Sequence, residues 1–137
     1  MNGIILAAGI SSRLRPLTND TPKCLLPVGG RPLLERTLRS LEQTGIRECV
    51  IVTGYFREKV EHFAAALRLS LKIEFRYNPY FASTNNNYSL WMAGEGCKGK
   101  DILLLDADIL FDRRLIPLLL DAPYENALIM RSSSRLG

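Results

Sequence analysis

The sequence predicts an α/β fold with a mainly parallel sheet, because strand-like apolar runs alternate with helical patterns along the chain. The first run, residues 2–6, is apolar without alternation, which is typical of a strand covered on both faces. At 137 residues the chain suits one domain. Right-handed crossovers between the strands then predict a Rossmann-like three-layer α/β/α arrangement.

The other elements follow in order. Pro32 is well placed to open a helix, Gly45 ends it, and an apolar stripe runs between them: Leu33, Leu34, Thr37, Leu38 and Leu41. We expect four further strands, over residues 49–53, 71–77, 101–105 and 127–131. Helices are expected over 57–69, 88–94 and 113–120, with a kink at Pro117. The segments 7–31 and 78–87 are predicted to be loops.

Composition excludes several classes of protein. Lys and Arg number 18 against 14 Asp and Glu, but these bases form no block, so a nucleic-acid partner is the least favoured. No apolar run approaches membrane-spanning length and the start has no signal-peptide pattern, so we expect a cytoplasmic protein without a membrane partner. Cys24, Cys49 and Cys97 match no zinc or disulfide spacing and are expected to be reduced, buried thiols.

Ligands of open parallel sheets bind beyond the carboxyl ends of the strands. This rule places the loop after Leu6, the turn Gly54-Tyr55 and the pair Asp106 and Asp108 along one edge. The residues with the most chemistry in them are therefore expected to converge there.

The opening loop has the properties of a phosphate site. Ala7, Ala8 and Gly9 have little or no side chain, so a nucleotide can lie against the main chain. Arg13 offers a planar fork for phosphate oxygens and Lys23 a mobile charge. Neither G-x-x-x-x-G-K-[ST] nor G-x-G-x-x-G follows the strand, which argues against a dehydrogenase. The alternative is an ordinary solvated basic loop.

Three stretches, LAAG at 6–9, SRLRPLT at 12–18 and PKCLLPV at 22–28, resemble the signature L-A-A/G-G-x-G-x-R-L-x-P-L-T…P-K-x-L-L-P-V. This signature belongs to the NTP-transferase family, the nucleotidyltransferases that make sugar-nucleotides and CDP-alcohols. Ser11 stands where the family usually has its second glycine. The resemblance implies a fold of the nucleotide-diphospho-sugar transferase type. It also implies a nucleotide contact by Leu6, Ala7, Ala8, Gly9, Ser11, Ser12, Arg13 and Lys23. Arg13 would hold the triphosphate and Lys23 the transferring phosphate.

Asp106 and Asp108 follow the strand predicted over 101–105. A carboxylate that faces a triphosphate is a natural ligand for Mg²⁺, which takes one or two carboxylates and completes its shell with water and phosphate. The resemblance assigns Asp108 as the magnesium ligand. Asp106 is expected to be a second ligand of the ion, to accept a hydrogen bond from a group that the ion binds, or to cap a turn.

The segment NPYFASTNNNYSL at 78–90 resembles the corresponding part of bacterial choline-phosphate cytidylyltransferases and their relatives that act on phosphonates. It implies that Asn86 and Asn87 contact the base and that Ser89 caps the helix or contacts the nucleotide. The alternative is a polar turn with Asn87 as the helix N-cap. Tyr55 is expected to flank the nucleotide. We expect Trp91 in the core and His62 in solvent.

The implied reaction transfers CMP from CTP to a phosphorylated small molecule, such as phosphocholine or a phosphonate, and releases pyrophosphate. Arg13, Lys23 and Asp108 would be its catalytic residues, and Mg²⁺ its cofactor. Alternatives are a sugar-1-phosphate nucleotidyltransferase that uses UTP, dTTP or GTP, and a non-catalytic nucleotide-binding domain. The resemblance runs from Gly3 to about Phe111, the front of the family's catalytic domain. We therefore expect a C-terminally truncated domain, 1–137, that largely lacks the acceptor-binding part and self-associates through an exposed sheet edge.

Overall fold

A computed structural model describes residues 1–10 and 12–130 of the protein. Its centre is a four-stranded sheet in the order β5-β4-β1-β6, and every neighbouring pair in it is parallel. The strands are β1 (Asn2–Ala7), β4 (Glu48–Thr53), β5 (Lys72–Tyr77) and β6 (Ile102–Asp106). The parallel sheet predicted from the sequence is confirmed, with each of these strands within two residues of its expected bounds.

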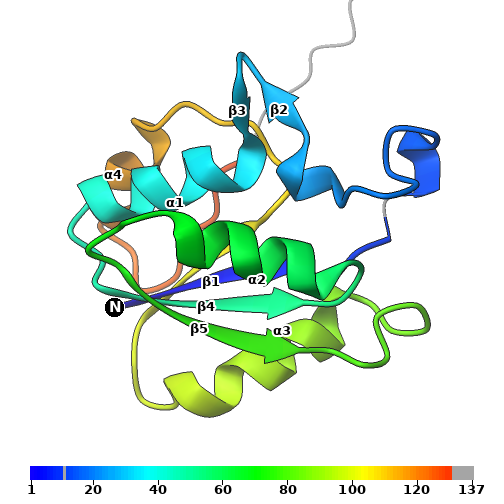
Figure 1. Ribbon diagram of the computed structural model, residues 1–137. Coiled ribbons are helices and arrows are strands. Elements are labelled where there is room, and N and C mark those ends of the chain that lie inside the picture. The colour runs from blue at the N-terminus through cyan, green and yellow to red at the C-terminus, as the bar shows by residue number, and fades with distance from the viewer. Residues whose placement is uncertain (11, 131–137) are drawn as a thin grey trace, which may run out of the picture.

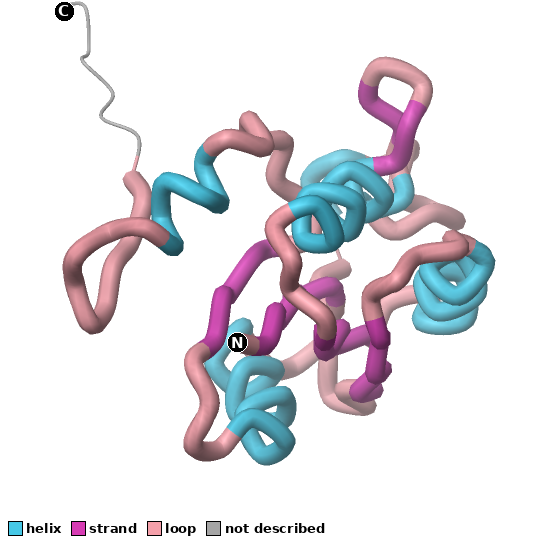
Figure 2. Tube along the Cα trace, turned by 90° about the vertical axis from the view of Figure 1, so that its left-hand side faces the viewer, coloured by secondary structure: helices cyan, strands magenta, loops and turns pink. Residues whose placement is uncertain are grey.

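Helices cover both faces of the sheet. Helices α1 (Leu33–Gln43) and α2 (Arg57–Ala66) lie over one face, and α3 (Asn86–Gly94) lies over the other (Figure 1). The short helix α4 (Leu115–Leu120) follows β6, and in Figure 2 it lies beyond the β6 end of the sheet. The three-layer α/β/α arrangement is therefore confirmed.

Strand β1 separates two apolar clusters because its alternate side chains point to opposite faces. Ile5 and Ala7 belong to the cluster that contains Leu34, Leu38 and other residues of α1 and α2. Ile4 and Leu6 belong to the second cluster, on the α3 side. All six residues of β1 are buried, as expected of a strand whose apolar run does not alternate.

Helix α1 forms as its sequence predicts. The five residues of the expected apolar stripe are all buried. Gly45 follows the C-cap residue Thr44 and has a left-handed φ of +81°, which ends the helix. Helix α2 is shorter than expected, because Leu67 turns to an extended conformation directly after Ala66. Helix α4 begins at Leu115, so Pro117 stands in its first turn, where proline is tolerated, and the kink predicted at 117 is not needed.

The segment 7–31, predicted to be one long loop, contains short elements. The 3₁₀ helices η1 (Ser12–Leu14) and η2 (Lys23–Leu25) are followed by a hairpin of β2 (Pro27–Val28) and β3 (Arg31–Pro32). A third 3₁₀ turn, η3 (Glu95–Cys97), extends α3. Within the described chain no helix has the length and apolar character needed to cross a membrane.

The strand predicted over 127–131 is wrong for residues 127–130, which form no strand, and Arg131 lies outside the described residues. Leu128 is 79% exposed and Met130 78% exposed. The apolar run at 127–130 fits a strand, but a strand also needs a neighbour with which to hydrogen-bond. The described sheet ends at β6, whose pairing is with β1.

Strand β6 leaves apolar surface uncovered. Leu103 is buried on the α1 side, whereas Ile102 and Leu104, which point to the other face, are 44% and 43% exposed. Strand β6 is also an outer strand of the described sheet, so the exposed sheet edge expected from the sequence is present in the described part of the chain.

Three loops of the carboxyl edge meet at Gly54, the first residue after β4. A Cβ atom at Gly54 would lie 2.6 Å from the Cβ of Phe81 and 2.8 Å from the carbonyl oxygen of Ala8. The backbone N–H of Tyr55 also donates to that carbonyl, at 3.5 Å. Glycine is needed here because the other two loops approach the main chain so closely.

Gly54→Ala is expected to lower the free energy of unfolding by about 1–3 kcal/mol, because the added methyl overpacks this junction. The matched control is Gly94→Ala at the end of α3, where an added Cβ meets open space. That control is expected to raise stability by about 0.5–1 kcal/mol, since alanine is the better helix former. Urea unfolding of both variants measures the difference, and equal effects would contradict the packing argument.

Candidate nucleotide-binding site

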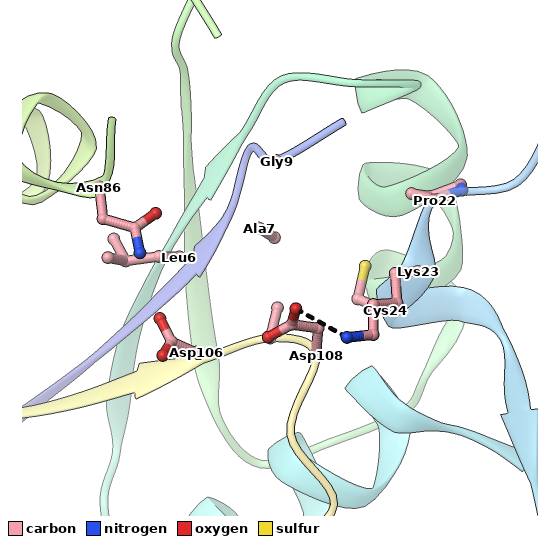
Figure 3. Close-up of a pocket in the computed structure, with 10 residues that line it drawn as sticks. Leu6, Ala7, Gly9, Pro22, Lys23, Cys24, Asn86, Asp106 and Asp108 are labelled. Carbon is pink, nitrogen blue, oxygen red and sulfur yellow. Dashed lines mark hydrogen bonds and ion pairs between the residues drawn. The ribbon is translucent and has the colours of Figure 1, made fainter. Parts of the chain in front are cut away.

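A pocket lies at the carboxyl ends of β1 and β6, the edge that the sequence predicted (Figure 3). Four segments contribute to it: the end of β1, the start of η2, the start of α3 and the turn after β6. Its lining residues are Leu6, Ala7, Gly9, Pro22, Lys23, Cys24, Asn86, Asp106, Ala107 and Asp108. Seven of the residues predicted from the sequence are thus brought together: Leu6, Ala7, Gly9, Lys23, Asn86, Asp106 and Asp108.

Lys23 and Asp108 form an ion pair across the pocket. The Nζ atom of Lys23 lies 3.2 Å from Oδ2 of Asp108, although the two residues are 85 positions apart in the chain. Their side chains are 34% and 45% exposed, so the pair adds little to stability. The pair matters for where it lies. It places a cation that suits phosphate oxygens, Lys23, beside an anion that suits a metal ion, Asp108, at the pocket.

Asp106 is the second carboxylate of the pocket. Partial burial, and then the negative charge of Asp108, raise the pKa of Asp106 above its usual range. A bound divalent cation would relieve this repulsion, so the two carboxylates suit such an ion chemically. Among the described residues no group of three His, Cys, Asp or Glu side chains could enclose a metal. Any cation held here would therefore need oxygen ligands from water or a bound phosphate, as Mg²⁺ commonly has.

The end of β1 presents main chain to the pocket. Ala7 is 7% exposed, whereas Gly9 is exposed, and a Cβ atom added at Gly9 would touch nothing within 4 Å. The space in front of Gly9 is therefore open to a ligand. Ala8 is buried, and its carbonyl oxygen accepts the hydrogen bond from Tyr55, so it serves the packing of the edge.

Other predicted residues lie away from the lining residues of this pocket. Ser12 and Arg13 are exposed on η1, and Ser11 lies outside the described residues. The Tyr55 hydroxyl donates to the carbonyl oxygen of Thr18 at 2.6 Å, within the opening loop. His62 is exposed, as expected.

The asparagine run has divided roles. Asn86, the first residue of α3, lines the pocket. Asn85 is the N-cap, and its Oδ1 accepts from the backbone N–H of Asn87 at 3.1 Å. The N-cap that the alternative interpretation assigned to Asn87 is therefore Asn85, because the helix begins two residues earlier than its apolar pattern indicates. Asn87 itself is exposed.

Sequence reasoning missed Asn78, which organises this loop. Asn78 is 1% exposed; its Nδ2 donates to the hydroxyls of Thr84 at 3.0 Å and Ser89 at 3.2 Å. Its Oδ1 accepts from the backbone N–H of Tyr80 at 2.9 Å. Ser89 thus bonds Asn78 rather than lining the pocket. The available signal was the Asn-Pro pair, which often starts a turn closed by the asparagine side chain.

Trp91 was expected in the core, and this prediction is wrong. Its side chain is 61% exposed and its ring lies 5.6 Å from that of Tyr88 on the outer side of α3. The face of α3 that packs on the sheet is formed by smaller residues, Ser89, Leu90 and Ala93.

The fold and the pocket together define a class: a three-layer α/β domain that presents small residues, a lysine and paired carboxylates at the carboxyl edge of a parallel sheet. The chain belongs to the family of MobA-like NTP transferase domains, whose model matches residues 3–136. This confirms the resemblance found in the opening loop.

Curated relatives of the chain include a choline-phosphate cytidylyltransferase and a CMP-phosphonate synthase. It is 39% identical over 115 residues to choline-phosphate cytidylyltransferase of Haemophilus influenzae, which covers 84% of the chain and 47% of that relative. It is 37% identical over 127 residues to CMP-5'-(3-aminopropyl)phosphonate synthase of Streptomyces rubellomurinus, covering 93% of the chain and 20% of that relative. The chain therefore spans less than half the length of these relatives.

Among solved structures, the chain is similar to the CTP:phosphocholine cytidylyltransferase from Streptococcus pneumoniae. The TM-score is 0.69 at 36% identity, over 82% of this chain and 47% of the other. The fold class predicted from the sequence is confirmed by this likeness.

The thiols of the protein are buried. Cys24 lines the pocket but is only 3% exposed, and burial raises the pKa of its thiol to about 12. Burial likewise raises the pKa of Cys49 to about 12. Cys97 is also buried, and all three residues are free cysteines, as the sequence predicted. A protonated, enclosed thiol is a poor nucleophile, so Cys24 serves packing.

At pH 8 the native chain is expected to react with a thiol reagent such as DTNB about a hundredfold more slowly than the urea-unfolded chain. The raised pKa values also predict that stability is greatest below the ordinary thiol pKa of 9.0 and falls as the pH rises toward 12. Labelling rates and urea unfolding across this range test both statements. Rapid labelling of any thiol in the native chain at pH 8 would contradict the first.

Proposed function

We propose that the chain binds a nucleoside triphosphate with Mg²⁺, with CTP preferred, and transfers CMP to a phosphorylated small molecule such as phosphocholine or a phosphonate. The observation that carries this proposal is the convergence of Lys23, Asp106, Asp108 and the open main chain at Gly9 on one pocket. The names of the curated relatives support the choice of nucleotide and acceptor.

The pocket has two chemically different ends, which supports an orientation for the nucleotide. Figure 3 shows Asn86 on one side, with Asp106 below it, and the Lys23–Asp108 pair on the other side. We place the base toward Asn86, whose amide both donates and accepts hydrogen bonds, as the edge of cytosine requires. The triphosphate would then pass the small residues at the end of β1 and reach Lys23.

In the proposed reaction an oxygen of the acceptor's phosphate or phosphonate attacks the α-phosphorus of CTP in line. A new bond forms between them, the bond from the α-phosphorus to the bridging oxygen breaks, and pyrophosphate leaves. Lys23 neutralises charge on the phosphates, and Asp108 with Asp106 would hold Mg²⁺. Arg13 has the same role by the family signature alone, since it lies outside the lining of the pocket. When bound, that ion would polarise the phosphate oxygens and neutralise their developing charge. The protein thus contributes positioning and charge and supplies no nucleophile.

Titration calorimetry with CTP, UTP, GTP, ATP and dTTP, each with Mg²⁺, tests this proposal. CTP is expected to bind most tightly. Asp108→Asn should weaken Mg·CTP binding by about tenfold or more, because it removes one ion ligand. Asp121→Asn, which changes an exposed carboxylate after α4, is the matched control and should leave affinity unchanged.

Pyrophosphate release on adding phosphocholine to the CTP complex would support catalysis by this chain. Selective CTP binding without release, with phosphocholine and with an aminoalkylphosphonate, would favour a nucleotide-binding domain without catalysis. Tightest binding of UTP, dTTP or GTP would instead favour a sugar-1-phosphate nucleotidyltransferase. Binding of no nucleotide would contradict the proposal.

We also propose that copies of the chain self-associate along β6. The support is that this edge strand carries the half-exposed Ile102 and Leu104 beside an unpaired main-chain edge of the described sheet. Leu104→Lys is expected to shift the chain toward monomer, because a charge on an edge strand opposes pairing. Leu17→Lys, at a 64% exposed leucine of the opening loop, is the control. Sedimentation velocity over a range of concentrations measures both, and a monomeric wild-type chain throughout would refute the idea.

A further inference from the structure

Two side chains hold the opening loop: Tyr55, from the turn before α2, and Lys59, from the first turn of that helix. The Tyr55 hydroxyl, which donates to Thr18, also lies 3.3 Å from the carbonyl oxygen of Asn19. The Lys59 ammonium group donates to the carbonyl oxygen of Asp20. Three successive loop carbonyls therefore face donors from one turn of the chain. We call these hydrogen bonds of Tyr55 and Lys59 to the loop carbonyls the brace of the opening loop.

Tyr55 contacts the loop at two places. Its backbone N–H bonds Ala8 at the end of β1, and its side chain bonds Thr18, ten residues later. The segment between these points carries Arg13, and the chain then continues through Pro22 to Lys23 in the pocket. One residue thus fixes both ends of the segment that carries Arg13, and Lys23 follows beyond that segment.

The turn that presents Tyr55 is built for close contact. Gly54 admits Ala8 and Phe81 against the main chain, as described above. Phe56 has a φ of +51°, in the left-handed region that a bulky residue seldom adopts. Its ring lies 4.6 Å from that of Tyr55, and the Lys59 ammonium lies 4.8 Å above it. The contacts of the turn therefore retain a backbone conformation that is otherwise unfavourable.

We propose that Tyr55 is a positioning residue, which holds the opening loop in its nucleotide-binding conformation without touching the nucleotide. This inference rests on the proposed function, because the loop's task is to bind phosphates. It replaces the prediction that Tyr55 flanks the nucleotide, since the hydroxyl group is directed to Thr18 and Asn19. A loop ordered before the ligand arrives binds more tightly, since less conformational freedom is lost on binding.

Tyr55→Phe keeps the ring and removes only the hydroxyl group. If the loop then samples other conformations, only a fraction of the molecules has the loop in its nucleotide-binding conformation. The apparent affinity for Mg·CTP falls in proportion to that fraction. Loss of one such hydrogen bond predicts about a fivefold weaker affinity. Once the loop is closed on the nucleotide its geometry is the same, so the turnover rate of any active form should be nearly unchanged.

The experiment combines two measurements on wild type, Tyr55→Phe and a control. Trypsin cleavage of the bond after Arg13 reports the order of the loop without any nucleotide, and titration with Mg·CTP reports affinity. Tyr124→Phe is the matched control, because it removes a hydroxyl from a side chain that is 73% exposed near the C-terminus. Thermal unfolding of each variant shows how much stability is lost.

The expected result is about fivefold faster cleavage and about fivefold weaker binding for Tyr55→Phe, with Tyr124→Phe unchanged. Lys59→Met should act in the same direction because it removes the second donor of the brace. Lower thermal stability with unchanged affinity would overturn the positioning role and leave Tyr55 as packing. Unchanged cleavage would overturn the brace itself. If the wild-type chain binds no nucleotide, the proposed function fails, and the positioning role fails with it; cleavage then decides only whether the brace orders the loop.

Discussion

The pairing of β1 with a parallel neighbour on each side is the constraint on which the site depends. The register places Leu6 opposite Asp106 of β6 and Ala7 opposite Thr53 of β4. Because side chains alternate along a strand, a slip of β6 by one residue would turn Asp106 to the other face of the sheet, away from the pocket. The apolar run at the start of the chain therefore determines more than the core. Through its register with β6 it also determines where along the edge of the sheet the two aspartates lie.

The charged groups of the pocket come from irregular segments supported by this rigid edge. Lys23 belongs to a short 3₁₀ turn and Asp108 to the turn after β6, and they meet because η2 packs against α1 while β6 pairs with β1. Both groups remain partly exposed, so a ligand can reach them. The hydrophobic layers fix where these segments emerge, and the polar contacts of Tyr55 and Asn78 fix the shape that two of the loops adopt.

Much of this arrangement could be predicted from the sequence, for identifiable reasons. Strands with unbroken apolar runs and a helix bounded by Pro32 and Gly45 carry local signals. The rule for parallel sheets brought the opening loop, with Lys23, and the two aspartates to one edge, and the resemblance of the segment 78–90 pointed to Asn86. The errors involve contacts that no local pattern encodes. Trp91 lies outside because the small residues of α3 face the sheet, and residues 127–130 form no strand because they lack a neighbour. The hydroxyl of Tyr55 bonds a carbonyl 37 positions earlier, which only the folded chain reveals.

The junction of Ala8, Gly54 and Phe81 has a consequence for how such sequences diverge. These residues belong to three loops that are distant in the chain but touch at one point, so the effect of changing one depends on the other two. A larger residue at position 54 becomes acceptable only after the loops that carry Ala8 and Phe81 have both moved away, because the nearest atoms are a backbone oxygen and a Cβ atom that a smaller side chain at position 81 would keep. Change in this part of the family should therefore be correlated, with shifts of the two loops preceding the loss of the glycine.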